Sequence, residues 1–145
     1  MTVALTGETD ADAARIAAAI DGAAPSLILD FVWGNAAEAT FRALGRPGLD
    51  SDEADIAYVQ IGSMGGAEAS VPASLLRSRR IFLIGSGAGS ASIAEIMAQL
   101  PVYMQFIADG RVMVPVRNYP LTRVADAWAA SALSRERIVV FAESR

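Results

Sequence analysis

Three short loops rich in glycine and serine are the parts of this sequence whose residue types suit chemistry. They contain Trp33-Gly34, Gly62-Ser63 and Gly85-Ser86. Each loop follows an apolar run. Glycine lets the backbone come close to a ligand, and backbone N–H groups bind phosphate readily. If the apolar runs are neighbouring parallel strands, the loops share one edge of a sheet, and a cleft there suits a flat ligand that carries phosphates.

The apolar runs before these loops cover residues 27–32, 56–61 and 81–84. The last of them has four consecutive apolar residues between turn formers, which predicts a strand buried on both faces. Helical patterns separate the three runs. This β-α-β rhythm is typical of a parallel sheet with right-handed crossovers, so the sequence predicts an α/β fold.

Other segments carry weaker signals. Residues 2–6 are β-prone, and a helix is expected over 13–20 with Thr9 or Asp10 as its N-cap. Asn35 and Glu38 resemble a capping box that begins a helix ending at Gly45. Further along, the pattern predicts a long helix over 93–107 with a kink at Pro101, strands over 112–116 and 138–141, and a helix over 121–128 between them.

Composition excludes several classes of function. The chain has 145 residues, of which 53% are apolar and 19% charged, and its net charge is −4 with scattered arginines, so neither disorder nor nucleic-acid binding is expected. The sequence contains no Cys and no His, which argues against a zinc site and against Ser-His-Asp catalysis. Every basic residue is Arg, which excludes Schiff-base chemistry. No apolar stretch is long enough to span a membrane, and we expect a cytoplasmic protein.

Several candidate residues have two interpretations. The loop over residues 85–90 has the spacing G-x-G-x-G instead of G-x-G-x-x-G, so a turn is favoured over a pyrophosphate cradle. Trp33 could stack on a cofactor ring, although packing in a core or interface is the favoured interpretation. Asp30, inside an apolar strand, either satisfies neighbouring backbone donors or lines the cleft.

Two further groups are expected to be structural. Trp128 and three methionines, Met97, Met104 and Met113, are expected in the core. The arginines Arg77, Arg79 and Arg80 precede the strand over 81–84 and so lie at the wrong edge of the sheet to hold a phosphate. A solvated or interface role is therefore favoured for them.

Six segments together resemble the C-terminal portion of the medium-chain dehydrogenase/reductase superfamily, in particular its quinone-oxidoreductase-like and zinc-binding-dehydrogenase-like members. The segments are LILDFVWG, YVQIGSMGG, VPASLLRSRRIFLIGSG, AEIMAQLPVYMQFIADGRV, VPVRNYPLTRVADAWAA and RIVVF. The resemblance covers nearly the whole chain, and it depends on the order and spacing of the segments more than on any one of them.

The resemblance implies a partial Rossmann-type parallel sheet flanked by helices, from an enzyme that in its intact form binds NADP or NAD for hydride transfer. Residues 1–86 would form the distal half of the cofactor-binding domain. Residues 87–145 would form a helix-strand-helix-strand segment that returns to the substrate domain in complete members, in one compact unit with the rest. Carried over by position, the cofactor contacts fall on Val32, Trp33, Ile61, Gly62, Ser63, Ile84, Gly85 and Ser86. No catalytic residue and no metal ligand is carried over, and no zinc is expected.

The resemblance also implies a homodimer. In the family, the strand that corresponds here to Arg80, Ile81, Phe82, Leu83 and Ile84, ending at Gly85, pairs with its twin across a two-fold axis. No nucleic-acid or membrane partner is expected.

The departures from the family pattern shape the functional hypothesis. A complete member is more than twice as long, and the glycine-rich pyrophosphate turn and the substrate domain have no counterpart here. We therefore expect a fragment or truncated relative that is inactive alone. Two alternatives stay open: a non-catalytic homo-oligomeric assembly module, and a small nucleotide- or anion-binding domain.

Overall fold

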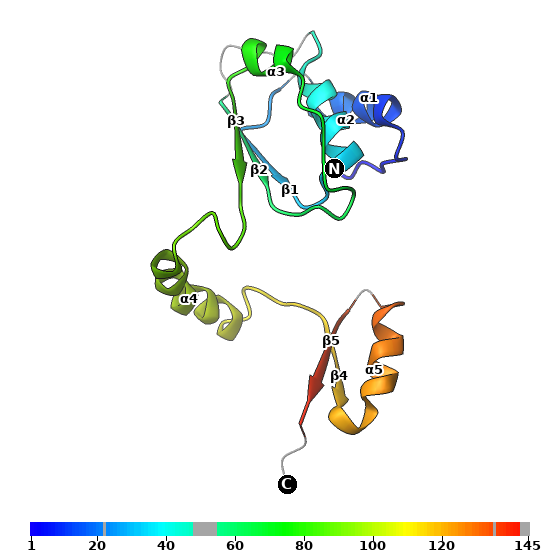
Figure 1. The fold of residues 1–145 in the computed structure, drawn as a ribbon, viewed down its shortest axis with the longest axis vertical. Helices are drawn as coiled ribbons and strands as arrows, with labels where there is room; N and C mark the ends of the chain where they lie inside the picture. The colour runs from blue at the N-terminus through cyan, green and yellow to red at the C-terminus, as the bar shows by residue number, and fades with distance from the viewer. Residues whose placement is uncertain (22, 48–54, 135, 143–145) are drawn as a thin grey trace. The chain divides into compact units, whose positions relative to one another are not determined.

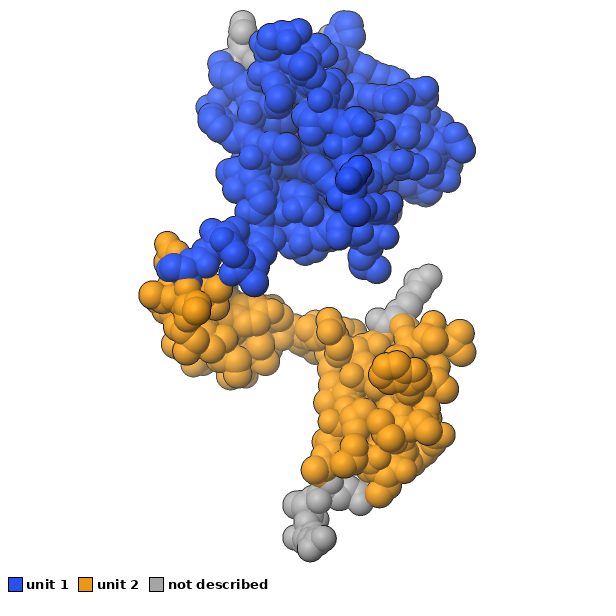
Figure 2. Space-filling view, in the orientation of Figure 1, with its two compact units in different colours: residues 1–92 blue, residues 93–145 orange. Residues whose placement is uncertain are grey.

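The computed structural model describes residues 1–21, 23–47, 55–134 and 136–142. The chain divides into two compact units, residues 1–92 and residues 93–145, coloured separately in Figure 2. Within the described ranges, no helix combines the length and the apolar character that crossing a membrane requires.

The first unit is built on a three-stranded parallel sheet (Figure 1). Its strands are β1 (Leu27–Asp30), β2 (Ile56–Gln60) and β3 (Ile81–Gly85), in the order β1-β2-β3. Its helices are α1 (Thr9–Ile20), α2 (Gly34–Leu44) and α3 (Ala73–Ser78). The predicted α/β fold with a parallel sheet is therefore confirmed, and the three apolar runs are its strands.

The core of this unit lies between one face of the sheet and the helices. Its buried members are Ala37, Phe41, Leu44, Ile56, Tyr58 and Leu75. Ile28 and Ile81 pack against this cluster, so alternate residues of each strand face the helices. The α1 helix lies beside α2 (Figure 1), and Arg42 forms an ion pair with Asp10 across the two helices.

The prediction that residues 81–84 are buried on both faces is wrong for this chain. Phe82 is 59% exposed, and Leu83 and Ile84 are about half exposed. The physical reason for Phe82 and Ile84 is that they lie in register with Ala57 and Val59, on the face of the sheet opposite the core. Leu83 lies on the core face, in the edge strand of the sheet as the described residues form it. Leu27 and Leu29 of β1 are also about half exposed, because they lie on the face opposite the core.

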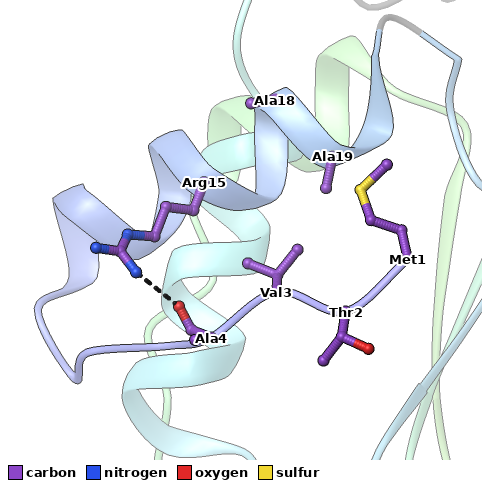
Figure 3. A pocket seen from close by; sticks show the side chains of 7 residues that line it. All are labelled: Met1, Thr2, Val3, Ala4, Arg15, Ala18 and Ala19. Carbon is purple, nitrogen blue, oxygen red and sulfur yellow. Dashed lines mark hydrogen bonds between the residues drawn. The ribbon is translucent and has the colours of Figure 1, made fainter.

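Residues 2–6 do not form the predicted strand. A strand needs a hydrogen-bonded neighbour, and this segment bonds to α1 instead. Arg15 Nη1 donates to Ala4 O at 3.0 Å, and the Asp12 carboxylate accepts from Thr6 N at 2.8 Å and Gly7 N at 2.9 Å. The pKa of Asp12 is lowered, chiefly by the hydrogen bond that its carboxylate accepts from the backbone N–H of Thr6. Figure 3 shows the hollow that this segment encloses with Ala18 and Ala19.

The helix boundaries also differ in part from the sequence analysis. Glu8, not Thr9 or Asp10, is the N-cap of α1. The expected capping box at Asn35 is wrong, because α2 already begins at Gly34 and Glu38 Oε1 accepts from Ser70 N at 2.9 Å. The predicted end of α2 at Gly45 is confirmed by its N–H, which donates to Phe41 O at 3.0 Å.

The second unit holds a long helix and a small parallel pair of strands. Its elements are α4 (Ile93–Ala108), β4 (Val116–Pro120), η1 (Leu121–Arg123), α5 (Val124–Ser131) and β5 (Arg137–Phe141). The helix over 121–128 and the strand over 138–141 are confirmed, whereas the strand predicted over 112–116 begins only at Val116. The α4 helix continues through Pro101, and Gly110 N donates to Ile107 O just after its end.

The prediction that Trp128 and the three methionines are core residues is wrong. Trp128 is 81% exposed, and Met97, Met104 and Met113 are each more than half exposed. No residue of α4 is buried, and α5 buries only Ala127. The reason is the size of the second unit, because one helix on two strands has too little surface to cover a large side chain such as Trp128.

Candidate functional site

The residues predicted to contact a cofactor all lie where the strands of the first unit end. Val32 and Trp33 follow β1, whereas Ile61, Gly62 and Ser63 follow β2. Ile84 and Gly85 are the last residues of β3, and Ser86 comes directly after it. Because the three strands are parallel and adjacent, these residues share one edge of the sheet. We call this the carboxyl edge.

The loops after β1 and β2 touch through their backbones. Asp30 O accepts hydrogen bonds from Ile61 N at 2.7 Å and from Gly62 N at 3.1 Å. Gly65 N donates to Val32 O at 2.7 Å. A Cβ atom on Gly62 would lie 2.3 Å from Phe31 O, so only glycine permits this approach.

The same restriction applies on the other side of the contact. A Cβ atom on Gly34 would lie 2.5 Å from Gly65 O, and Gly34 also has a positive φ of 58°. Glycines from both loops therefore bring two backbones together at the carboxyl edge.

The end of β3 is tied to β2 through Gln60. Ser86 N donates to Gln60 O at 2.7 Å, and Gln60 Nε2 donates to Gly62 O at 2.9 Å. Beyond Ser86 the loop closes on itself, since Gly87 N donates to Ser90 Oγ and Ser90 N donates to Gly87 O. The loop over residues 85–90 thus contains a turn, as its glycine spacing favours.

Asp30 satisfies neighbouring backbone donors, which is one of the two alternatives for this residue. It is 8% exposed, and its Oδ1 accepts from Val32 N and Trp33 N, both at 2.8 Å. Its Oδ2 accepts from the hydroxyl of Tyr58. Burial raises the pKa of Tyr58, and the hydrogen bond to Asp30 raises it further. Tyr58 is therefore a neutral donor at physiological pH.

Sequence reasoning missed the role of Tyr58. The signal for it was a lone acidic residue in one apolar run and a lone phenol in the next. Their contact depends on the register, in which Ile28 pairs with Tyr58 and Asp30 with Gln60. That register cannot be obtained from either strand alone.

Trp33 packs on the core instead of standing free. Its ring makes edge-to-face contacts with Phe41 and Tyr58, with ring centroids 6.0 Å and 6.4 Å away. Its backbone has φ 60° and ψ −159°. Residues other than glycine rarely adopt this conformation, because it costs them about 1–3 kcal/mol. The side chain is half-buried. Packing therefore accounts for the ring, and a cofactor contact at Trp33 stays a prediction.

The carboxyl edge is electrically neutral apart from the buried Asp30. Its other residues offer backbone groups, the hydroxyls of Ser63 and Ser86, and apolar side chains. Two of the three arginines before β3 are engaged elsewhere: Arg79 Nε donates to Leu44 O at 3.0 Å, and Arg80 forms an ion pair with Asp55 at 2.7 Å. Such an edge can hold and orient a ligand, but it presents no side chain that exchanges protons near pH 7.

Comparisons with known proteins found one similar sequence and two similar structures to report. No protein-family model matches this chain. The probable NADPH-dependent quinone reductase tdiC of Emericella nidulans is 25% identical over an alignment of 122 residues; the match covers 79% of this chain and 33% of the relative.

Two solved structures share the fold. A putative alcohol dehydrogenase from Sinorhizobium meliloti 1021 superposes with a TM-score of 0.61 at 20% identity, covering 90% of this chain and 33% of the other. CurA from Vibrio vulnificus, in complex with NADPH, gives a TM-score of 0.56 at 16% identity, covering 92% and 41%. The resemblance to medium-chain dehydrogenases and reductases is confirmed.

The similarity concerns only part of each relative. The chain spans about a third of the length of the quinone reductase that it matches. It covers 33% of the alcohol dehydrogenase structure and 41% of CurA. The fold is therefore shared with part of each of the two solved structures.

Substitution of Gly62 tests the close approach of the two loops. We expect Gly62→Ala to lower the free energy of unfolding by about 1–3 kcal/mol, because the new methyl group meets the Phe31 carbonyl. Gly87→Ala is the matched control, since nothing lies within 4 Å of a Cβ atom there. Urea unfolding followed by tryptophan fluorescence measures both. Equal stability of Gly62→Ala and the unsubstituted chain would contradict the observed contact.

Proposed function

We propose that this chain carries the nicotinamide-side part of an NADPH-dependent oxidoreductase, which transfers hydride between NADPH and a carbonyl, quinone or enone. One observation carries the proposal: the eight predicted contact residues, from three separate strands, all lie at the carboxyl edge. The quinone reductase named as NADPH-dependent and the NADPH complex of CurA support the choice of cofactor.

The chemistry of the carboxyl edge suits a nicotinamide. Hydride transfer is supplied by the cofactor, so the protein has to bind the ring, orient it and exclude water. Backbone groups held at fixed positions by Asp30 and Gln60 can orient the polar end of the ring. Gly85 leaves the approach to its backbone open, since nothing lies within 4 Å of a Cβ atom there, and the apolar side chains of Val32 and Ile84 exclude water.

We propose further that the chain does not catalyse the reaction alone. The turn after Gly85 lacks the spacing of a pyrophosphate site, and the carboxyl edge offers no proton donor suited to neutral pH. The nicotinamide end of the cofactor would therefore be bound here, while the pyrophosphate and the substrate require further protein.

Titration with NADPH tests this proposal. The chain has two tryptophans, so Trp128→Phe leaves Trp33 as the single reporter at the carboxyl edge. We expect a saturable change in Trp33 fluorescence, with a half-saturating NADPH concentration near the upper end of about 1 µM–1 mM, the range of KM values typical of enzymes. In the control, Trp33→Phe, the exposed Trp128 should not respond. A Trp33 signal that shows no saturable change would contradict the proposal.

The exposed edge of β3 favours assembly as a second function. Three consecutive apolar residues of this strand, Phe82, Leu83 and Ile84, are about half exposed, and among the described residues the strand pairs only with β2. An apolar strand edge is a template for pairing with another chain. We propose that β3 pairs with the same strand of a second copy across a two-fold axis.

Leu83→Pro tests the pairing of β3. Amides of a strand alternate between its two sides, and Ser86 N points to β2, so the Leu83 amide points to the open edge. We expect Leu83→Pro to convert a dimer into a monomer in light scattering at micromolar concentration, with an unchanged far-UV CD spectrum. Leu83→Ala, which keeps the amide, is the matched control and should stay dimeric. A monomeric unsubstituted chain, or a dimeric Leu83→Pro variant, would contradict this pairing.

A further inference from the structure

Asp30 accepts hydrogen bonds from donors on both loops of the carboxyl edge. Its carboxylate accepts from Val32 N and Trp33 N, each at 2.8 Å, and from the Tyr58 hydroxyl. Its carbonyl oxygen accepts from Ile61 N at 2.7 Å and from Gly62 N at 3.1 Å. One residue thus fixes the start of the loop after β1 and the start of the loop after β2.

Four of these five donors are backbone amides of residues predicted to contact the cofactor. We propose that Asp30, held by Tyr58, is a positioning residue that sets the geometry of the carboxyl edge for the nicotinamide end of NADPH without touching it. The inference rests on the proposed function for its ligand. The positioning itself is a property of this chain that can be measured without any ligand.

Tyr58 is essential to this arrangement because both partners are removed from water. Asp30 is 8% exposed and Tyr58 is 1% exposed, so water has little access to replace the phenol hydroxyl. A buried carboxylate oxygen without a donor is strongly disfavoured, and the structure around it would rearrange to find one. The raised pKa of Tyr58 keeps the proton on its oxygen over the whole physiological range.

Trp33 is the part of the carboxyl edge that depends most on this pair. Its backbone, at φ 60° and ψ −159°, is strained and has to be held by its surroundings. The holding contacts are the hydrogen bond from Trp33 N to Asp30 Oδ1 and the packing of its ring on Tyr58 and Phe41. Asp30, Tyr58 and Trp33 therefore form a closed set of contacts, in which loss of the Tyr58 hydroxyl loosens the loop after β1.

The test is amide hydrogen exchange, followed by NMR on the full chain. We expect Tyr58→Phe to speed exchange at Val32 and Trp33 by about fivefold to tenfold beyond the change at core amides such as Phe41. A merely structural role would speed exchange at all slow amides alike. Tyr103→Phe, the same chemical change at a half-exposed position, is the matched control and should change none of them.

Substitutions at Asp30 provide the second comparison. Asp30→Asn keeps one oxygen for the Val32 and Trp33 amides and offers an N–H to the Tyr58 oxygen, so it should retain most of the protection. Asp30→Ala removes both side-chain acceptor oxygens, so the protection of the Val32 and Trp33 amides from exchange should be lost. Uniform acceleration in Tyr58→Phe, or equal exchange in Asp30→Asn and Asp30→Ala, would overturn the proposal.

Binding of NADPH separates this inference from the proposed function. In the Trp128→Phe background, Tyr58→Phe should raise the dissociation constant for NADPH by at least about fivefold, whereas Tyr103→Phe should leave it unchanged. If the parent chain shows no binding, the proposed function fails, and the exchange rates still decide whether Asp30 and Tyr58 position the loops.

Discussion

A buried carboxylate must find donors for both of its oxygens, and in this protein that requirement shapes the carboxyl edge of the sheet. Asp30 takes two backbone amides from the loop that follows it and a hydroxyl from the neighbouring strand. Its carbonyl takes two more amides from the loop after β2. These hydrogen bonds all have Asp30 as their acceptor. They fix the residues just before α2, including Trp33, and the residues just after β2.

The close backbone approach of the two loops is the second half of this constraint. Donors on the loop after β2 reach Asp30 only because Gly62 has no side chain to meet Phe31. Gly34 likewise has no side chain to meet Gly65. The result is an edge of fixed backbone groups with little charge, which suits orienting a neutral ring better than acid-base chemistry. The fold that holds this edge is shared with the solved structure of CurA, of which this chain covers 41%.

Much of this arrangement could be predicted from the sequence because its signals are local. Apolar runs between turn formers located β1, β2 and β3, and the alternation with helical patterns indicated that they are parallel. Asp30 stood out as an acidic residue inside such a run, and satisfaction of nearby backbone donors was one of its two expected roles. The glycines after each strand pointed to the correct edge of the sheet.

What the sequence could not provide depends on contacts between distant segments. Residues 2–6 have β propensity, but a strand also needs a neighbour, and this segment bonds to α1 instead. Glu38 was expected to cap its own helix and binds Ser70, 32 residues away. Trp33 adopts a positive φ that its residue type disfavours, because Asp30 and the core hold it there. Trp128 has an apolar helical face, yet the second unit has too little surface to cover it.

The NMR measurement of an NOE between the α-protons of Phe31 and Gly62 tests the central claim most directly. The account predicts a clear cross peak in the full chain, because a Cβ atom on Gly62 would lie only 3.2 Å from the Phe31 Cα. Absence of that peak in a spectrum that shows the parallel register of β1 and β2 would mean that the two loops do not meet. The positions assigned to Asp30, Gly62 and Trp33 would then be wrong.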